Sequence, residues 1–102
     1  MPVYNGEDTI EVALRSVLEG LPKEAEVIVV DDASTDRTAE VVRQFPVTLV
    51  SHATNKGPSA ARNSGVQQAK GELLVFIDAD VQVMEGALHS LLAQLKSNPS
   101  LY

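Results

Sequence analysis

Two pairs of acidic residues stand directly after apolar segments of this sequence. Asp31 and Asp32 follow the run VIVV, and Asp78 and Asp80 follow the run LLVFI. Like charges held close together are mutually destabilising unless a cation, hydrogen-bond donors or water compensates them. The Asp-x-Asp spacing offers hard oxygen ligands that suit Mg²⁺ or Mn²⁺, which commonly keep part of their coordination for water and substrate phosphates. The pattern therefore predicts a site for a divalent cation.

The segments that must position these carboxylates alternate between helices and strands. Apolar residues at helical spacing predict helices, and short β-branched runs predict strands. The predicted helices cover residues 7–21, 36–45, 58–71 and 85–96, and the predicted strands cover residues 27–30, 47–51 and 73–77. This alternation implies parallel βαβ units with right-handed crossovers. We therefore predict the α/β class, with a Rossmann-like, open, mostly parallel sheet and helices on both faces.

Parallel strands deliver the residues that follow them to one edge of the sheet, where such folds bind ligands. Four carboxylates should therefore face a single crevice: Asp31, Asp32, Asp78 and Asp80. The loop of residues 52–57 should join them, with Arg62 one turn into the helix that begins near Pro58. Helix N-termini at this edge favour an anion. A nucleoside diphosphate sugar, bound with a metal ion, has every group that such a crevice requires.

The bulk composition limits the other classes of function. The 102 residues suffice for one domain, and 44% hydrophobic with 22% charged residues is the composition of a folded protein. A net charge of -6 with eight basic residues argues against nucleic acid as a partner. The absence of cysteine excludes disulfides and fits a cytoplasmic protein. The longest apolar run has about six residues, so we expect no membrane span, although the inner face of the membrane remains open as a location.

Four motifs carry a resemblance to a known family. The segments PVYN, VIVVDDASTD, NKGPSAARNSGVQQAKGE and LLVFIDAD stand in the order and at about the spacing of the nucleotide-binding half of glycosyltransferase family 2. Together they cover nearly the whole chain. The sequence therefore resembles that family, and the resemblance implies a GT-A fold and transfer of a sugar from a nucleotide donor, with a UDP-sugar favoured.

The resemblance also implies roles for single residues on the nucleotide side of the site. Asp32 would bind the base, and Pro2 and Tyr4 of PVYN would line the pocket around it. Arg62 of AARN would contact the nucleotide as well. These four residues form the nucleotide-binding set that the resemblance predicts, together with Asp78.

The DAD triplet resembles the Asp-x-Asp motif of the family. Asp80 would hold Mg²⁺ or Mn²⁺, while Asp78 would reach the ribose or share the cation. Members of the family generally invert the anomeric centre, with a general base that deprotonates the acceptor hydroxyl. That base has no counterpart in this chain, and the glycan, lipid or protein that accepts the sugar is not indicated.

Two departures from the family pattern bear on the domain organisation. Met1 stands immediately ahead of Pro2, where the family usually has several apolar residues of a central strand, and the chain stops after SNPSLY. We expect a gap in the sheet and interpret residues 1–102 as a donor-binding part, truncated at both ends. The alternatives are a non-catalytic module that binds nucleotide or completes its sheet with a partner, such as a second copy in a homodimer, and a phosphoryl or nucleotidyl transferase.

Some of the polar residues have simpler interpretations. Asp36 and Ser34 fit capping and turn positions, which could also explain Asp31 and Asp32 if they stood alone. Arg62 alone would pass for a solvated helix residue. His52 and His89 lack metal-ligand spacing and are interpreted as structural or solvated. No Gly-x-Gly-x-x-Gly motif occurs, which disfavours a dinucleotide oxidoreductase.

Overall fold

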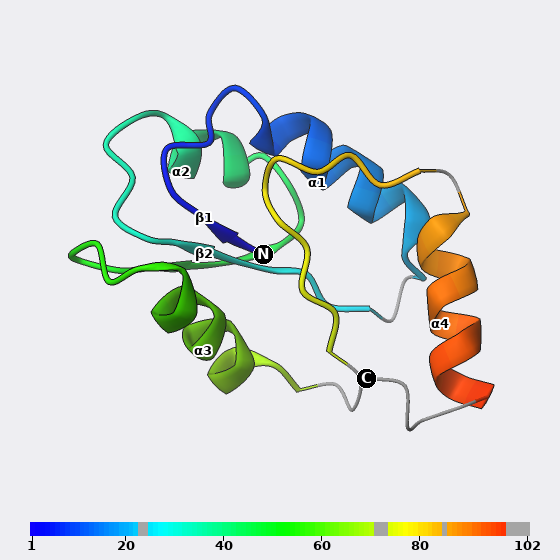
Figure 1. The fold of residues 1–102 in the computed structure, drawn as a ribbon. Coiled ribbons are helices and arrows are strands. Elements are labelled where there is room, and N and C mark those ends of the chain that lie inside the picture. The colour runs from blue at the N-terminus through cyan, green and yellow to red at the C-terminus, as the bar shows by residue number, and fades with distance from the viewer. Residues whose placement is uncertain (23–24, 71–73, 85, 98–102) are drawn as a thin grey trace.

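A three-stranded parallel sheet lies at the centre of the computed structural model, which describes residues 1–22, 25–70, 74–84 and 86–97 (Figure 1). Its strands, in spatial order, are β1 (Pro2–Val3), β2 (Ile28–Asp31) and β3 (Thr48–Ser51). Val3 pairs with Asp31, and Asp31 pairs with Ser51. The last residues of all three strands therefore stand in one row, and whatever follows each strand begins at the same edge.

Four helices accompany the sheet. They are α1 (Ile10–Gly20), α2 (Thr38–Val42), α3 (Pro58–Gln68) and α4 (Ala87–Ser97). Figure 1 shows α1 and α2 on one side of the sheet and α3 on the other. The α/β class and the parallel sheet covered on both faces are thus confirmed. None of the helices in the described ranges has the length and apolar character needed to cross a bilayer.

The β-branched run of β2 is buried on both faces of the sheet, as its continuous apolar character predicts. Val29 joins Ile10, Leu14 and Val42 in the core that α1 and α2 cover. Val30 points the other way, because a Cβ built on Gly65 of α3 would lie 3.5 Å from Val30 Cγ2. Successive residues of one strand thus pack against helices on opposite faces of the sheet.

The contact between α1 and α4 depends on a glycine at the end of α1. A Cβ on Gly20 would lie 3.2 Å from Leu88 Cδ1, so the absence of a side chain lets α4 approach. Leu88 is buried, whereas Leu91 is 37% exposed. The described part of α4 is therefore packed most closely at Leu88, with Leu92 half-buried.

The helix boundaries differ from the predicted ones by a few residues. α1 begins at Ile10 rather than at residue 7, because the N–H groups of Thr9 and Ile10 both donate to the carbonyl of Gly6 and form a turn. α2 ends early, and residues 43–45 continue as hydrogen-bonded turns. α3 ends at Gln68 rather than near Gly71, which lies outside the described residues. Helix ends of this kind are set by local hydrogen bonds that periodicity does not report.

The strand predicted at residues 73–77 is wrong for residues 74–77, and Leu73 lies outside the described residues. Residues 74–77 form no ladder, and Phe76 is 55% exposed. A strand needs a neighbour with free backbone groups along its length. The β1 edge offers only two residues, one of which is a proline without an N–H group. The apolar run is therefore an irregular trace in Figure 1.

Candidate functional site

The side chain of Asp32 is buried at the carboxyl end of β2, against the loop of residues 52–57. Asp32 Oδ1 accepts a hydrogen bond from the N–H group of Lys56, and Oδ2 accepts one from the N–H group of Gly57, both at 2.8 Å. The side-chain amide of Asn55 donates to the Asp32 carbonyl at 3.3 Å. Asp32 itself is only 4% exposed. The carboxylate thus fastens the loop that leads into α3 to the end of β2.

His52 is the third partner of this carboxylate. His52 Nδ1 lies 2.7 Å from Asp32 Oδ1, and His52 Nε2 lies 2.8 Å from Ser64 Oγ on α3. The histidine side chain is 7% exposed, so it is structural, one of the two interpretations the sequence left open. The predicted crevice includes the loop of residues 52–57, in which His52 itself is interpreted as structural or solvated. The signal was its position: His52 directly follows β3, as Asp32 directly follows β2.

These partners determine the ionisation of Asp32. The hydrogen bond with the His52 side chain, helped by the N–H groups of Lys56 and Gly57, lowers the pKa of the Asp32 carboxyl below its usual value, although burial acts in the opposite direction. Asp32 is therefore a carboxylate at neutral pH. A buried carboxylate with fixed donors is a hydrogen-bond acceptor of defined orientation.

Asp31, the neighbouring acid, has a different role. Its Oδ1 accepts a hydrogen bond from the N–H group of Ser34 at 3.1 Å, which closes the turn after β2. Ala33 within that turn has a φ of 63°, a left-handed conformation that the turn imposes. Asp31 is buried like Asp32. The turn interpretation is therefore confirmed for the Asp31 side chain, whereas the Asp32 side chain is hydrogen-bonded to the loop of residues 52–57.

The loop after β1 is bound to the loop after β2 through Asn5. The N–H group of Asn5 donates to Ser34 Oγ at 2.8 Å, and Asn5 Oδ1 accepts a hydrogen bond from the N–H group of Thr35 at 2.8 Å. Asn5 has a φ of 49°, which asparagine tolerates better than most residues. Tyr4, next to it, is 51% exposed, and Pro2 is half-buried. The Tyr4 ring is thus available at a rigid loop.

A second set of hydrogen bonds extends this junction to the start of α2. Thr38 Oγ1 accepts from the N–H group of Gly6 at 2.9 Å, and Asp36 Oδ2 accepts from the N–H group of Glu7 at 3.2 Å. Asp36 Oδ1 accepts from the N–H group of Thr38 at 3.0 Å, which confirms the capping interpretation of Asp36. Burial raises the pKa of the Asp36 carboxyl, but the hydrogen bonds outweigh it and the pKa is lowered.

Arg62 and Asp78 face each other across the gap between α3 and the segment of residues 74–84. Arg62 Nη2 lies 3.9 Å from Asp78 Oδ1, and both side chains are largely exposed. At that distance the pair is an electrostatic contact rather than a hydrogen bond. The guanidinium therefore keeps most of its donors free for an anionic ligand.

Asp80 lies beside the start of α1. It lines a hollow at the start of α1 together with Asp8, Thr9 and Val12. The segment that carries it is fixed to α1 by a hydrogen bond of 2.9 Å from the N–H group of Val83 to Ser16 Oγ. Asp80 thus lies beside the start of α1, whereas Asp32 contacts the loop of residues 52–57. Because residues 74–77 are not a strand of the sheet, strand pairing does not place Asp78 and Asp80, and the single crevice of four carboxylates stays a prediction.

Comparison with known proteins decides the family. The family described as Glycosyl transferase family 2 matches the chain over residues 1–102. The chain belongs to this glycosyltransferase family. It is 33% identical to the poly-beta-1,6-N-acetyl-D-glucosamine synthase of Staphylococcus epidermidis, over 96% of this chain and 25% of that protein.

Two solved structures extend the comparison to bound ligands. TarS of S. aureus, residues 1–349, in complex with UDP-GlcNAc, matches with a TM-score of 0.87 and 34% identity over 96% of this chain and 30% of TarS. The mannosyltransferase PcManGT of Pyrobaculum calidifontis, in complex with GDP-Man and Mn²⁺, matches with a TM-score of 0.73 and 38% identity over 78% of this chain and 26% of that one. The GT-A fold is confirmed, and this glycosyltransferase chain spans a third or less of these proteins.

The family implies a divalent metal ion, and the side chains of the chain can be examined as ligands for it. Among the residues that the structure describes, no group of three or more histidine, aspartate or glutamate side chains is placed to hold a metal ion. Asp78 and Asp80 are both exposed. Mg²⁺ and Mn²⁺ are commonly bound by one or two carboxylates with water and substrate phosphates completing the shell. Two exposed carboxylates at Asp-x-Asp spacing fit that mode.

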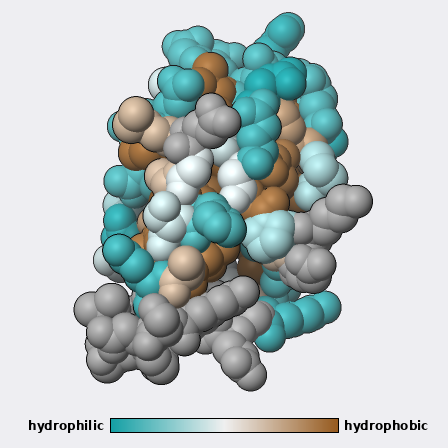
Figure 2. Space-filling view, turned by 90° about the vertical axis from the view of Figure 1, so that its right-hand side faces the viewer, coloured by the Kyte–Doolittle hydropathy of each residue, from teal (hydrophilic) through white to brown (hydrophobic). Residues whose placement is uncertain are grey.

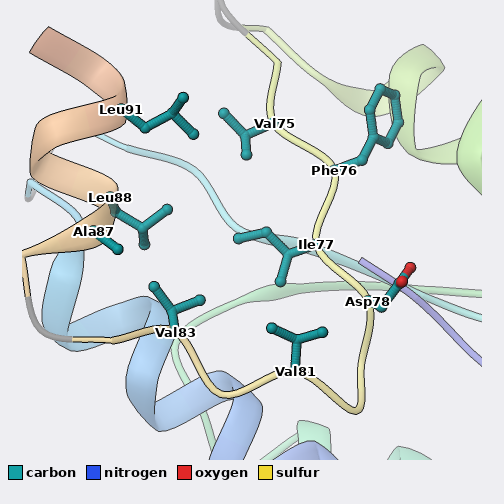
Figure 3. Close-up of a pocket in the computed structure, with 9 residues that line it drawn as sticks. All are labelled: Val75, Phe76, Ile77, Asp78, Val81, Val83, Ala87, Leu88 and Leu91. Carbon is teal, nitrogen blue, oxygen red and sulfur yellow. The ribbon is translucent and has the colours of Figure 1, made fainter. Parts of the chain in front are cut away.

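An apolar hollow of about 340 Å³ lies between residues 75–83 and α4 of this glycosyltransferase chain (Figure 3). Val75 points into it toward Leu91 and Ile77 points into it toward Leu88, whereas Phe76 and Asp78 point to the other side. Figure 2, which shows the α4 side, has apolar atoms exposed between polar ones. Asp78 is the only charged residue among the described residues that line it. The hollow offers few partners for a nucleotide, so we do not place the donor there.

Proposed function

We propose that this chain carries the donor-binding part of an enzyme that transfers a sugar from a nucleoside diphosphate sugar, with a UDP-sugar favoured, to an acceptor. The observation that carries the proposal is the Asp32 carboxylate, ionised and held by His52 and by the loop of residues 52–57 at the carboxyl edge of the sheet. Family membership and the similarity to TarS in complex with UDP-GlcNAc support it.

In this proposal each nucleotide-binding residue contacts a different part of the nucleotide sugar. Asp32 accepts a hydrogen bond from the base, and Pro2 and the exposed ring of Tyr4 line the base pocket. Arg62, which lies on α3 with a largely exposed side chain, contacts the diphosphate. The free acceptor capacity of Asp78 suits a ribose hydroxyl.

Metal dependence is part of the proposal. Asp80, with Asp78, would hold Mg²⁺ or Mn²⁺, and the diphosphate and water would complete the coordination. A bound cation neutralises the negative charge that develops on the leaving diphosphate. We further propose that the transfer inverts the anomeric centre, with the general base supplied from outside residues 1–102.

Isothermal titration calorimetry of UDP with Mn²⁺ tests the proposal. We expect binding by the wild-type chain that weakens at least about tenfold when Mn²⁺ is removed with EDTA. Asp80→Ala should lose the metal-dependent part of the affinity. Glu40→Ala removes an exposed acid of α2 and serves as the matched control, with unchanged affinity. Folded wild-type protein that binds no UDP in the presence of Mn²⁺ contradicts the proposal.

A further inference from the structure

We propose that His52 is a positioning residue for the donor base. It holds Asp32 so that one acceptor position, on Oδ2, stays free and oriented toward an N–H group of the base. The inference rests on the proposed function, because it assigns His52 to the same donor site. It goes beyond that function by naming a residue that contacts no donor atom and still determines how tightly the base binds.

The count of hydrogen bonds on Asp32 locates the free position. An ionised carboxylate has about four lone-pair positions, two on each oxygen. Oδ1 accepts from His52 at 2.7 Å and from the N–H group of Lys56 at 2.8 Å, so both of its positions are used. Among the residues that the structure describes, Oδ2 accepts only from the N–H group of Gly57. One position on Oδ2 therefore remains, and a single N–H group of a base can occupy it.

The same contacts assign the tautomer of His52. Because the Asp32 carboxylate can only accept, His52 Nδ1 carries the hydrogen in the neutral ring and Nε2 is an acceptor. The hydroxyl of Ser64 then donates to Nε2 across 2.8 Å. The ring is thus fixed at both nitrogens, between the end of β2 and α3.

Ser64 connects this arrangement to the other nucleotide-binding residue. Arg62, which we place on the diphosphate, lies on α3 two residues before Ser64. Asp32, His52 and Ser64 therefore form a hydrogen-bonded chain from the base site to α3, the helix that carries Arg62. Loss of the Nδ1 donor leaves Oδ1 with the N–H group of Lys56 alone, so the carboxylate is held less firmly in the orientation that presents Oδ2.

A Ser–His–Asp chain is also the arrangement of a nucleophilic triad. A nucleophile needs open space beside its oxygen for the substrate. The His52 side chain is only 7% exposed and Ser64 is half-buried, so little open space is left beside the Ser64 hydroxyl. The arrangement therefore fits the fixing of a side chain better than attack on a substrate.

Two amide substitutions separate the roles of the two ring nitrogens. The amide nitrogen of asparagine lies near the position of imidazole Nδ1, and that of glutamine lies near Nε2. We expect His52→Asn to bind UDP within about threefold of wild type and His52→Gln to lose about tenfold or more, the usual effect of removing a hydrogen bond to a charged group. Ser64→Ala should lose less than His52→Gln. His89→Gln, an exposed histidine of α4, is the matched control and should change nothing.

Nitrogen NMR of the ligand-free wild-type chain gives a second readout that does not depend on UDP. It should show His52 with hydrogen on Nδ1, and His52→Asn and His52→Gln should both keep a folded spectrum. Hydrogen on Nε2 in the neutral ring overturns the inference. Equal UDP affinity of wild type and His52→Gln also overturns it, while leaving the proposed function intact. Absence of UDP binding by the wild-type chain overturns the proposed function and the role of His52 together.

Discussion

His52 Nδ1 lies 2.7 Å from Asp32 Oδ1 although 20 positions separate the two residues in the chain. The register of the sheet produces this contact. Asp31 of β2 pairs with Ser51 of β3 in parallel, so the residue after each strand emerges at the same level. The N–H group of His52 donates to the Asp31 carbonyl at 2.9 Å and extends the ladder by one bond. The acid and its partner are therefore placed by strand pairing, before any loop is considered.

The lowered pKa of Asp32 predicts a pH-dependent contribution to stability. A carboxyl whose pKa is lower in the folded than in the unfolded state stabilises the fold above its unfolded value, about 3.9 for aspartate, and this contribution is lost as the pH falls through the folded pKa. We expect Asp32→Asn to be less stable than wild type at pH 7. The difference in unfolding free energy should shrink as the pH falls below about 4.

Urea denaturation of both proteins between pH 3 and pH 7, followed by circular dichroism, measures this difference. A difference that stays constant over the whole range would show that the Asp32 carboxyl titrates alike in the folded and unfolded states. Asp36 also has a lowered pKa and is present in both proteins, so its contribution cancels in the comparison.

Removal of the buried Thr38 hydroxyl should lower the stability of the fold, even when the new side chain has the same shape. Thr38 has no exposed surface, and its Oγ1 both accepts from the N–H group of Gly6 and donates to Asp36 Oδ1. Thr38→Val keeps the volume but leaves the N–H group of Gly6 without its acceptor and removes one of the two donors to Asp36 Oδ1, which costs about 1–3 kcal/mol. Thr48→Val, at an exposed position of β3, is the control and should lie within about 0.5 kcal/mol of wild type. Equal stabilities of the two variants in urea would contradict the importance of this junction.

Much of the fold follows from patterns in the sequence, because burial in these elements repeats with their own period. Val29 and Val30 are buried on opposite faces of β2, and Ile10, Leu14 and Val17 are buried along one side of α1. The strand predicted at residues 73–77 failed for a different reason. Its apolar character is real, but a strand also needs a paired neighbour, and the β1 edge offers only two residues. Pairing is a property of the sheet and not of the segment.

The candidate site could be predicted in part. The position of Asp32 at the end of a strand made it a candidate site residue, and the family resemblance made Arg62 a candidate for binding the same nucleotide. The contacts of Asp80 with the start of α1 could not be predicted, because they depend on the path of an irregular segment. His52 was assigned no role in the site because a lone histidine in a loop has no motif. Only the register of β2 and β3 shows that it must meet Asp32.

Leu14 tests the core between the sheet and α1. The residue has no exposed surface and lies in one cluster with Val29 and Val42. Leu14→Ala should cost about 2–5 kcal/mol, because the cavity that it leaves adds to the lost burial. Val12→Ala, on the same helix with 48% of Val12 exposed, should cost less than about 1 kcal/mol. Thermal denaturation of both variants ranks them, and similar melting temperatures would mean that α1 is not packed on β2 as described.

Substitution of Arg62 should weaken ligand binding but leave the stability of the fold nearly unchanged. Its contact with Asp78 is 3.9 Å long and largely exposed, and such pairs contribute at most about 1 kcal/mol. Arg62→Ala should therefore melt close to wild type. If the guanidinium contacts the diphosphate as we propose, UDP affinity should fall about tenfold or more, because hydrogen bonds between charged groups are the stronger kind. Arg43→Ala, at an exposed position just after α2, should change neither quantity. Calorimetric titration and thermal melting of the two variants decide the matter: unchanged UDP affinity of a folded Arg62→Ala would remove Arg62 from the donor site, and a large drop in melting temperature would make its role structural.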